Sequence, residues 1–148
     1  MNPKCILLVE DNLSDIELTR RALTRSRITN ELVVAQDGRE ALDVLRGTGP
    51  HAGTPALTPA LVLLDLNLPI MGGLDVLREI RGDPRLRRLP VVILTSSAEE
   101  QDRAASYDIG ANSYIRKPVD FVQFAASVEK LGLYWLVLNE PPPEVSPG

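Results

Sequence analysis

The chain has little of several residue types, and each scarcity excludes a class of protein. Its 148 residues include one cysteine and one histidine. A single cysteine excludes an intramolecular disulfide, and Cys5 lies in an apolar run, where a small core residue is expected. His51 has no Cys or acidic ligands nearby in the sequence, so it is expected to be an exposed spacer rather than a metal ligand. No apolar run approaches the length of a membrane span or of a signal-peptide core, so the cytoplasm is the expected compartment.

The chain also lacks an excess of positive charge. Its formal net charge is -4, and only Arg85, Arg87 and Arg88 form a tight basic group, which is typical of a solvated helix end. Because phosphate contacts need clustered Lys and Arg, direct binding to nucleic acid is not expected. A composition of 44% hydrophobic and 24% charged residues in 148 residues is typical of one ordinary globular domain.

Apolar runs and helical segments alternate along the chain. Most of the apolar runs are continuous rather than alternating, which predicts strands covered on both faces. Four of the intervening segments begin with the spacing of a capping box or a close variant of it. The pattern predicts five βα units in one doubly wound α/β sheet. The predicted strands are 5–10, 31–36, 60–65, 90–95 and 113–116, and the helix-start pairs are Ser14 with Glu17, Asp37 with Glu40, Ser97 with Glu100, and Asp120 with Gln123.

Two segments fall outside this alternation. Residues 47–59 carry several Gly and Pro residues without a helical period, which predicts a long surface loop before the third strand. The proline-rich end of the chain predicts a flexible tail at 139–148. The expected organisation is therefore one domain at 4–138, with an extended C-terminal helix, followed by the tail.

A polar group stands at the end of four of the apolar runs. Because the carboxyl ends of parallel strands form the ligand-binding crevice of such sheets, these groups are expected to converge. Carboxylates, a hydroxyl and an amine in one crevice indicate metal-assisted phosphoryl chemistry. The residues are Glu10, Asp11, Asp65, Thr95 and Lys117.

Four motifs in this order resemble the receiver domain of two-component response regulators, over about residues 4 to 138. That resemblance implies a flavodoxin-like five-stranded parallel sheet of order 2-1-3-4-5, with helices on both faces. It also implies phosphorylation by a sensor histidine kinase. The motifs are LLVEDN at 7–12, LLDLNLPIMGG at 63–73, VVILTSS at 91–97 and YIRKP at 114–118.

The resemblance implies a role for each polar group. Asp65 is the expected phosphoacceptor, since an ionised carboxylate can attack a phosphoryl group to form an acyl phosphate. Mg²⁺ is the expected cofactor, bound by Asp11, Asp65 and the backbone carbonyl of Asn67, with Glu10 acting mainly through water.

A second group of residues concerns the phosphoryl oxygens and the signal. Lys117 and Thr95 are expected to bind the phosphoryl oxygens, and the Lys117–Pro118 bond is expected to be cis. By resemblance, Thr95 moves inward after phosphorylation and Tyr114 rotates. The output face is then the surface of the fifth strand, the helix before it and the last helix.

The last helical segment carries a sustained apolar stripe, and residues 131–138 are apolar almost all round. Because exposed apolar surface often marks association sites, a homodimer through this helix and the fifth strand is favoured over a C-terminal end folded back on its own domain. The stripe and the 47–59 loop together resemble receivers paired with bacterial phytochrome kinases. The candidate dimer residues are Phe121, Phe124, Val128, Leu131, Tyr134 and Trp135.

These observations favour a single-domain response regulator, a signalling protein that catalyses only its own phosphorylation and dephosphorylation. A phosphorelay intermediate is the near alternative. A phosphohydrolase with an Asp nucleophile is a different class, but it needs a second acid two residues later, where Asn67 stands. A flavodoxin-like binding module is a third alternative, although three acids would repel a flavin phosphate.

Overall fold

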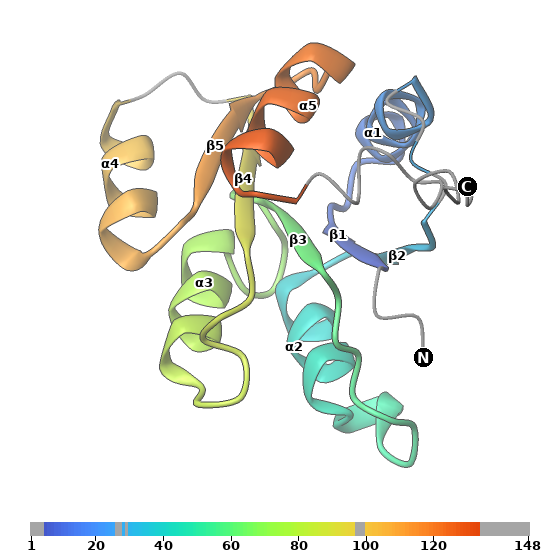
Figure 1. Ribbon diagram of the computed structural model, residues 1–148. Coiled ribbons are helices and arrows are strands. Elements are labelled where there is room, and N and C mark those ends of the chain that lie inside the picture. The colour runs from blue at the N-terminus through green and yellow to red at the C-terminus, as the bar shows by residue number, and fades with distance from the viewer. Residues whose placement is uncertain (1–4, 26–27, 29, 97–99, 134–148) are drawn as a thin grey trace, which may run out of the picture.

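Five parallel strands form one sheet with the order β2-β1-β3-β4-β5 (Figure 1). The computed structural model describes residues 5–25, 28, 30–96 and 100–133. The predicted fold and strand order are confirmed, and each predicted strand agrees with the observed one to within a residue at either end. The strands are β1 (Ile6–Val9), β2 (Leu32–Ala35), β3 (Leu61–Asp65), β4 (Val91–Thr95) and β5 (Ser113–Arg116).

Helices cover both faces of the sheet. Helices α1 and α5 pack together on one face, and α2, α3 and α4 form a row on the other (Figure 1). None of the helices in the described part of the chain is long and apolar enough to cross a membrane. The helices are α1 (Leu13–Arg25), α2 (Gly38–Arg46), α3 (Gly73–Gly82), α4 (Glu100–Ile109) and α5 (Phe121–Lys130), with a short 3₁₀ helix, η1 (Gly49–His51).

The core lies in two layers, because successive strand residues point to opposite faces. Leu8 and Leu63 pack with Phe124 of α5 under α1 and α5. Leu7 and Leu64 belong to the other layer, under α2, α3 and α4. All five side chains are fully buried. Both faces of the central strands therefore need apolar residues, which explains their continuous apolar runs.

Two of the predicted helix starts are confirmed by their hydrogen bonds. The Asp37 carboxylate accepts from the Glu40 N–H at 2.7 Å, and the Asp120 carboxylate accepts from the Gln123 N–H at 2.8 Å. Each carboxylate satisfies a backbone donor that the first helical turn leaves without a partner. The pair predicted at Ser97 lies outside the described residues.

The predicted start of the first helix at Ser14 is wrong. Helix α1 begins at Leu13, and the Asn12 side chain accepts from the Asp15 N–H at 3.0 Å. The Glu10 carboxylate in turn accepts from the Asn12 N–H at 3.2 Å. The local sequence offers two caps of similar spacing, and the buried Glu10 carboxylate favours the earlier one.

The loop at 47–59 is confirmed as a connection without long regular structure, although it contains the 3₁₀ helix η1. His51 ends that short helix and is half-buried rather than exposed. Cys5 is fully buried, as expected of a core residue.

The prediction of one continuous C-terminal helix is wrong within the described residues. Helix α5 ends at Lys130, and Gly132 has φ 75°, a left-handed conformation that stops a helix. The Leu133 N–H bonds back to the Val128 carbonyl at 2.8 Å, and Leu133 packs against the core layer under α1 and α5. Residues from Tyr134 onwards lie outside the described part of the chain.

Candidate functional site

The five polar groups predicted to converge come from the carboxyl ends of four strands. Glu10 follows β1, Asp65 ends β3, Thr95 ends β4 and Lys117 follows β5. Glu10 and Thr95 are fully buried and Asp65 is 4% exposed. Asp11 is exposed. Burial of acids and a hydroxyl at one edge of the sheet is costly unless they have partners or a function.

The Lys117 ammonium lies at the centre of the group. Its Nζ atom is 2.5 Å from Glu10 Oε1, 2.9 Å from Asp15 Oδ2 and 3.4 Å from Asp65 Oδ2. The Lys117 backbone N–H also donates to the Thr95 carbonyl at 2.8 Å, which ties the end of β5 to the end of β4. The Lys117–Pro118 peptide bond is cis.

Asp15 was not predicted from the sequence. It lies in the first turn of α1, four residues after Asp11, and its carboxylate accepts a hydrogen bond from Lys117. Helix α1 starts at Leu13, two residues after Asp11, so its first turn brings Asp15 to the site. An acidic residue in the first turn of the helix that follows Glu10 and Asp11 is the signal that could have identified Asp15, but the predicted cap at Ser14 obscured it.

Glu10 and Asp65 keep their protons more readily than ordinary carboxylates. Burial raises the pKa of Glu10, and the Asp65 charge raises it further, against the opposing effect of Lys117. Burial also raises the pKa of Asp65, although Lys117 and the Asn67 N–H favour its ionised form. For Lys117, burial alone lowers the pKa, but the bonds to Glu10 and Asp15 and the Asp65 charge outweigh burial and raise it.

The three predicted acidic ligands have a geometry that fits a divalent cation. Glu10, Asp11 and Asp65 each offer a carboxylate oxygen, and these oxygens lie within 4.8 Å of one another. Within the described residues, Glu10 Oε1 accepts no well-aligned hydrogen bond, although Lys117 Nζ is near it. Mg²⁺ prefers hard oxygen ligands, so the donor set suits it.

The segment after Asp65 is held close to the site by a glycine. Gly73 begins α3 and donates its N–H to the Leu66 carbonyl at 3.0 Å. A Cβ atom at this position would collide with the Asp65 carbonyl oxygen. Only glycine therefore lets α3 start this close to β3. Asn67 lies in the loop between them, with its side chain exposed.

The two residues predicted to relay the signal lie on adjacent strands. Tyr114 of β5 is level with Ile93 of β4, two residues before Thr95. Its side chain is half-buried and packs against the core layer under α2, α3 and α4. The structure therefore places Tyr114 beside α4, on the same side of the sheet.

The candidate dimer residues divide into core and surface. Phe124 and Val128 are fully buried within the protomer, so their assignment to a dimer face is wrong. They occupy the side of α5 that faces the sheet, while Phe121 on another side is 45% exposed. Leu131 is half-buried against the core. Tyr134 and Trp135 lie outside the described residues.

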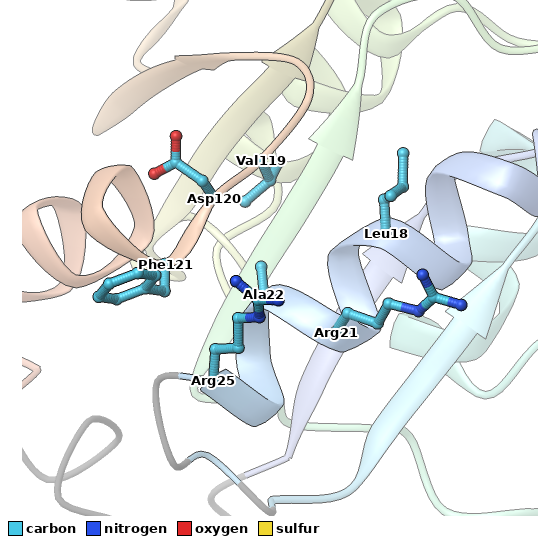
Figure 2. Close-up of a pocket in the computed structure, with 7 residues that line it drawn as sticks. All are labelled: Leu18, Arg21, Ala22, Arg25, Val119, Asp120 and Phe121. Carbon is cyan, nitrogen blue, oxygen red and sulfur yellow. The ribbon is translucent and has the colours of Figure 1, made fainter.

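A shallow groove lies between α1 and the start of α5 (Figure 2). Its apolar part combines Leu18 and Ala22 of α1 with Val119 and Phe121. Figure 2 shows the Arg25 side chain extending beside Ala22, across from Phe121. Arg21 and Asp120 complete the lining. Val119, one of the lining residues, lies two residues after Lys117 in the sequence.

Comparison with known proteins is consistent with this geometry. Residues 6–129 match the family described as response regulator receiver domain. The response regulator Rcp1 from Synechocystis sp. is 41% identical over 134 residues, which cover 90% of this chain and 90% of Rcp1. A solved structure of Rcp1, in its Mn²⁺-bound form, has a TM-score of 0.73 at 41% identity and covers 90% of this chain and 95% of that one.

Two further solved structures are similar. The bacteriophytochrome response regulator AtBRR has a TM-score of 0.82 at 52% identity, and the match covers 93% of this chain and 98% of AtBRR. The phosphorylated cyanobacterial phytochrome response regulator RcpA has a TM-score of 0.73 at 42% identity, over 94% of this chain and 96% of RcpA. The predicted resemblance to receivers of bacterial phytochromes is confirmed.

Proposed function

The chain belongs to the family of response regulator receiver domains, and from this premise we propose that it is a phosphoacceptor switch. Asp65 receives a phosphoryl group from the phosphohistidine of a sensor histidine kinase, and the surface of α4, β5 and α5 changes as a result. The observation that supports this most is the position of the Lys117 ammonium, 3.4 Å from the Asp65 carboxylate in a buried, acid-rich site.

The chemistry of transfer follows from the side chains. An Asp65 carboxylate oxygen attacks phosphorus and forms a P–O bond, while the P–N bond of the donor phosphohistidine breaks and its electron pair returns to the imidazole. Lys117 offsets the negative charge on the phosphoryl oxygens. The Thr95 hydroxyl, at the end of the neighbouring strand β4, donates to one of these oxygens.

Asp11, Asp65 and the Asn67 backbone carbonyl would hold Mg²⁺ at this site, and Glu10 would act through water. When bound, the ion supplies positive charge that reduces repulsion between the acids and the incoming phosphoryl group. Glu10 and Asp65 keep raised pKa values without this charge because both are buried.

The charge added at Asp65 changes the positions of neighbouring side chains. A phosphoryl group adds about -1.5 to -2 charge, which draws the Thr95 hydroxyl inward. Tyr114 then rotates into the space beside β4, and α4 shifts with it. The half-buried position of Tyr114, two residues along the ladder from Thr95, supports this route.

The partner is a sensor histidine kinase, and a bacterial phytochrome is the kind of kinase that the relatives favour. A kinase that delivers its phosphoryl group to Asp65 must also touch the surface beside the site. The groove of Leu18, Ala22 and Phe121 offers apolar anchorage there, with Arg21 and Arg25 to attract acidic side chains.

Replacing Arg21 by Glu should slow transfer from the kinase but leave labelling by a small phosphodonor unchanged.

A homodimer through the exposed side of α5 is part of the proposal. Phe121 is 45% exposed and Val122 is 62% exposed, and exposed apolar side chains at neighbouring positions favour association. Sedimentation at several concentrations tests this point, with Val122→Asp as the variant expected to dissociate the dimer. A species that stays monomeric at the highest concentration contradicts it.

Labelling of Asp65 tests the central claim. The protein is incubated with Mg²⁺ and acetyl phosphate, and the phosphorylated fraction is separated by phosphate-affinity electrophoresis. Wild type should reach at most one phosphoryl group per chain, and Asp65→Asn should show none. Asp75→Asn is the matched control, because Asp75 is exposed and pairs with Arg78 only at the surface of α3. Equal labelling of Asp65→Asn, or sustained turnover of small phosphate esters in favour of a phosphohydrolase, overturns the claim.

A further inference from the structure

Arg81, in the last turn of α3, joins three separate segments of the chain. Its Nε donates to the Gly110 carbonyl at 2.8 Å, and its Nη1 donates to the Arg87 and Leu89 carbonyls at 3.0 and 2.8 Å. Its Nη2 donates to Asn112 Oδ1 at 2.8 Å. Four of the five guanidinium N–H groups are therefore used, and each meets a neutral oxygen.

Two of the four Arg81 hydrogen bonds reach the loop between α4 and β5, at Gly110 and Asn112, and the other two reach the segment between α3 and β4. Asn112 Oδ1, which accepts from Arg81, also accepts from the Val91 N–H at 2.8 Å, and the Asn112 N–H donates to the Val91 carbonyl at 2.8 Å. The loop is thereby fixed to the start of β4. Gly110 has φ 124°, and a Cβ atom there would lie 2.9 Å from Arg81 Nε, so the guanidinium packs directly on the loop backbone.

The charge of Arg81 suits this position. Gly110 directly follows α4, whose C-terminal end carries partial negative charge, and Arg81 itself lies in the last turn of α3. A cation near helix C-termini is stabilising. No carboxylate among the described side chains forms an ion pair with Arg81, and burial lowers its pKa. Its interactions are therefore with backbone and amide oxygens. An exposed arginine would bind water instead of these oxygens.

At this end of α4, few side chains are fully buried. Ser106 is buried, Ile109 is half-buried and Tyr107 is 38% exposed. The Gly110 and Ala111 N–H groups both bond to the Ser106 carbonyl, at 3.1 and 2.8 Å, and close the helix. Ile109 and Ala111 supply the apolar packing of this end, and with so few apolar side chains the polar contacts add to what holds it in place.

We propose that Arg81 holds the C-terminal end of α4 as a fixed pivot, so that phosphorylation displaces the N-terminal end of this helix and leaves the 110–112 loop in place. This proposal rests on the proposed function for its signalling role, but the anchoring itself does not depend on phosphorylation. Arg81 is a positioning residue: it lies outside the Asp65 site and acts through the backbone of the α4–β5 loop.

The first test measures the anchor in the unphosphorylated protein. Amide hydrogen exchange at Gly110, Ala111 and Asn112 is compared in wild type, Arg81→Met and Arg81→Lys. Exchange should be about 10-fold faster or more in Arg81→Met, equivalent to a loss of about 1.4 kcal/mol of local stability. Arg81→Lys keeps the charge but not the planar fork, so it should recover only part of the protection.

Arg78→Met is the matched control, because Arg78 lies one turn earlier on α3 and pairs only with Asp75 at the surface. It should leave exchange at 110–112 unchanged. Unchanged exchange in Arg81→Met overturns the proposal, as does an equal acceleration in the Arg78→Met control. Exchange in β1 serves as a reference, since equal acceleration there shows global destabilisation and not a local anchor.

The second test measures the pivot. Chemical-shift changes on adding Mg²⁺ and beryllofluoride are mapped in wild type and Arg81→Met. Wild type should show changes at 100–105 and Tyr114 that are at least about twice those at 110–112, whereas Arg81→Met should show similar changes at both ends. Equal changes at both ends of α4 in wild type contradict the pivot. If Asp65 is not labelled in wild type, the proposed function is contradicted instead. The exchange test still decides whether Arg81 anchors the loop.

Discussion

At the scale of single residues, the candidate site is defined by an imbalance of charge. One ammonium, Lys117, faces the buried carboxylates of Glu10 and Asp65 as well as Asp15. One positive charge cannot neutralise all three, and burial adds a penalty for each ionised group. The raised pKa values of Glu10 and Asp65 follow from this arrangement. The site is therefore under electrostatic strain that added positive charge relieves.

This strain predicts a pH dependence of stability without metal. Acids with a raised folded-state pKa hold protons that the unfolded chain releases, so their contribution is fully present below the unfolded values of 4.5 for Glu10 and 3.8 for Asp65. It is lost as the pH rises through the raised values. Glu10→Gln should match wild type near pH 4 and exceed it by on the order of 1 kcal/mol in free energy of unfolding at neutral pH.

Urea denaturation with chelator from about pH 4 to about pH 8 measures this difference. Glu17→Gln is the control, because Glu17 is exposed and pairs with Arg21 at the surface of α1. A difference between wild type and Glu10→Gln that stays constant across this range contradicts the prediction.

Ile70 presents a second case of local strain. It has φ 69°, a left-handed conformation that is costly for a β-branched residue, and its side chain is 79% exposed. Ile70→Asn should raise the free energy of unfolding by about 1 kcal/mol, since asparagine adopts this conformation more readily. Ile70→Val keeps the β-branch and should show no gain. Urea denaturation distinguishes the two, and an equal effect of both substitutions contradicts strain as the cause.

At the residue scale, the sequence predicted which polar groups meet, because each ends a recognisable apolar run. It did not predict Asp15, whose role depends on where α1 starts. It also gave no indication of the Arg81 contacts, since an arginine in the last turn of a helix is common. The partners of Arg81 are backbone carbonyls brought together only by the packing of α3 against the α4–β5 loop.

At the scale of elements, the sequence pattern of α5 correctly predicted an apolar face but not the surface that covers it. The stripe of Phe124 and Val128 is apolar as predicted, but it faces the sheet of its own protomer. Periodicity identifies a buried side and cannot tell a core from an interface. The predicted helix was also longer than the observed one. Apolar residues continue past Lys130, but the left-handed Gly132 stops the helix.

This division of α5 predicts losses of stability of different size for its two phenylalanines. Phe124 is fully buried, so Phe124→Ala should lower the free energy of unfolding by about 3 to 5 kcal/mol. Phe121 is 45% exposed, so Phe121→Ala should cost less than about 1 kcal/mol. Thermal or urea denaturation measures both, and Phe124→Leu gives a folded variant with a smaller loss. Similar losses for the two alanine variants contradict the assignment of Phe124 to the core.

At the scale of the whole molecule, the function of the site depends on topology. Glu10, Asp65, Thr95 and Lys117 are distant in the sequence, and a parallel sheet of order β2-β1-β3-β4-β5 brings their strand ends to one edge. The sequence was sufficient to predict this because most of the strands are continuous apolar runs, and parallel connections place a helix between successive strands. Capping choice and loop packing depend on contacts between distant segments, which a single sequence does not display.

A bound ion should stabilise the whole molecule through this site. A ligand that binds only the folded state adds about 2.7 kcal/mol of stability at one hundred times its dissociation constant. Saturating Mg²⁺ should therefore raise the midpoint of thermal unfolding in wild type, and Mn²⁺ should act in the same way. Asp11→Asn removes one of the three clustered carboxylates and should abolish most of the rise, whereas Asp75→Asn on the surface of α3 should keep it. Because Mg²⁺ also offsets the repulsion between Glu10 and Asp65, the stability of wild type should depend less on pH once the ion is bound. An equal rise in midpoint for Asp11→Asn and wild type places the effect of Mg²⁺ elsewhere on the molecule.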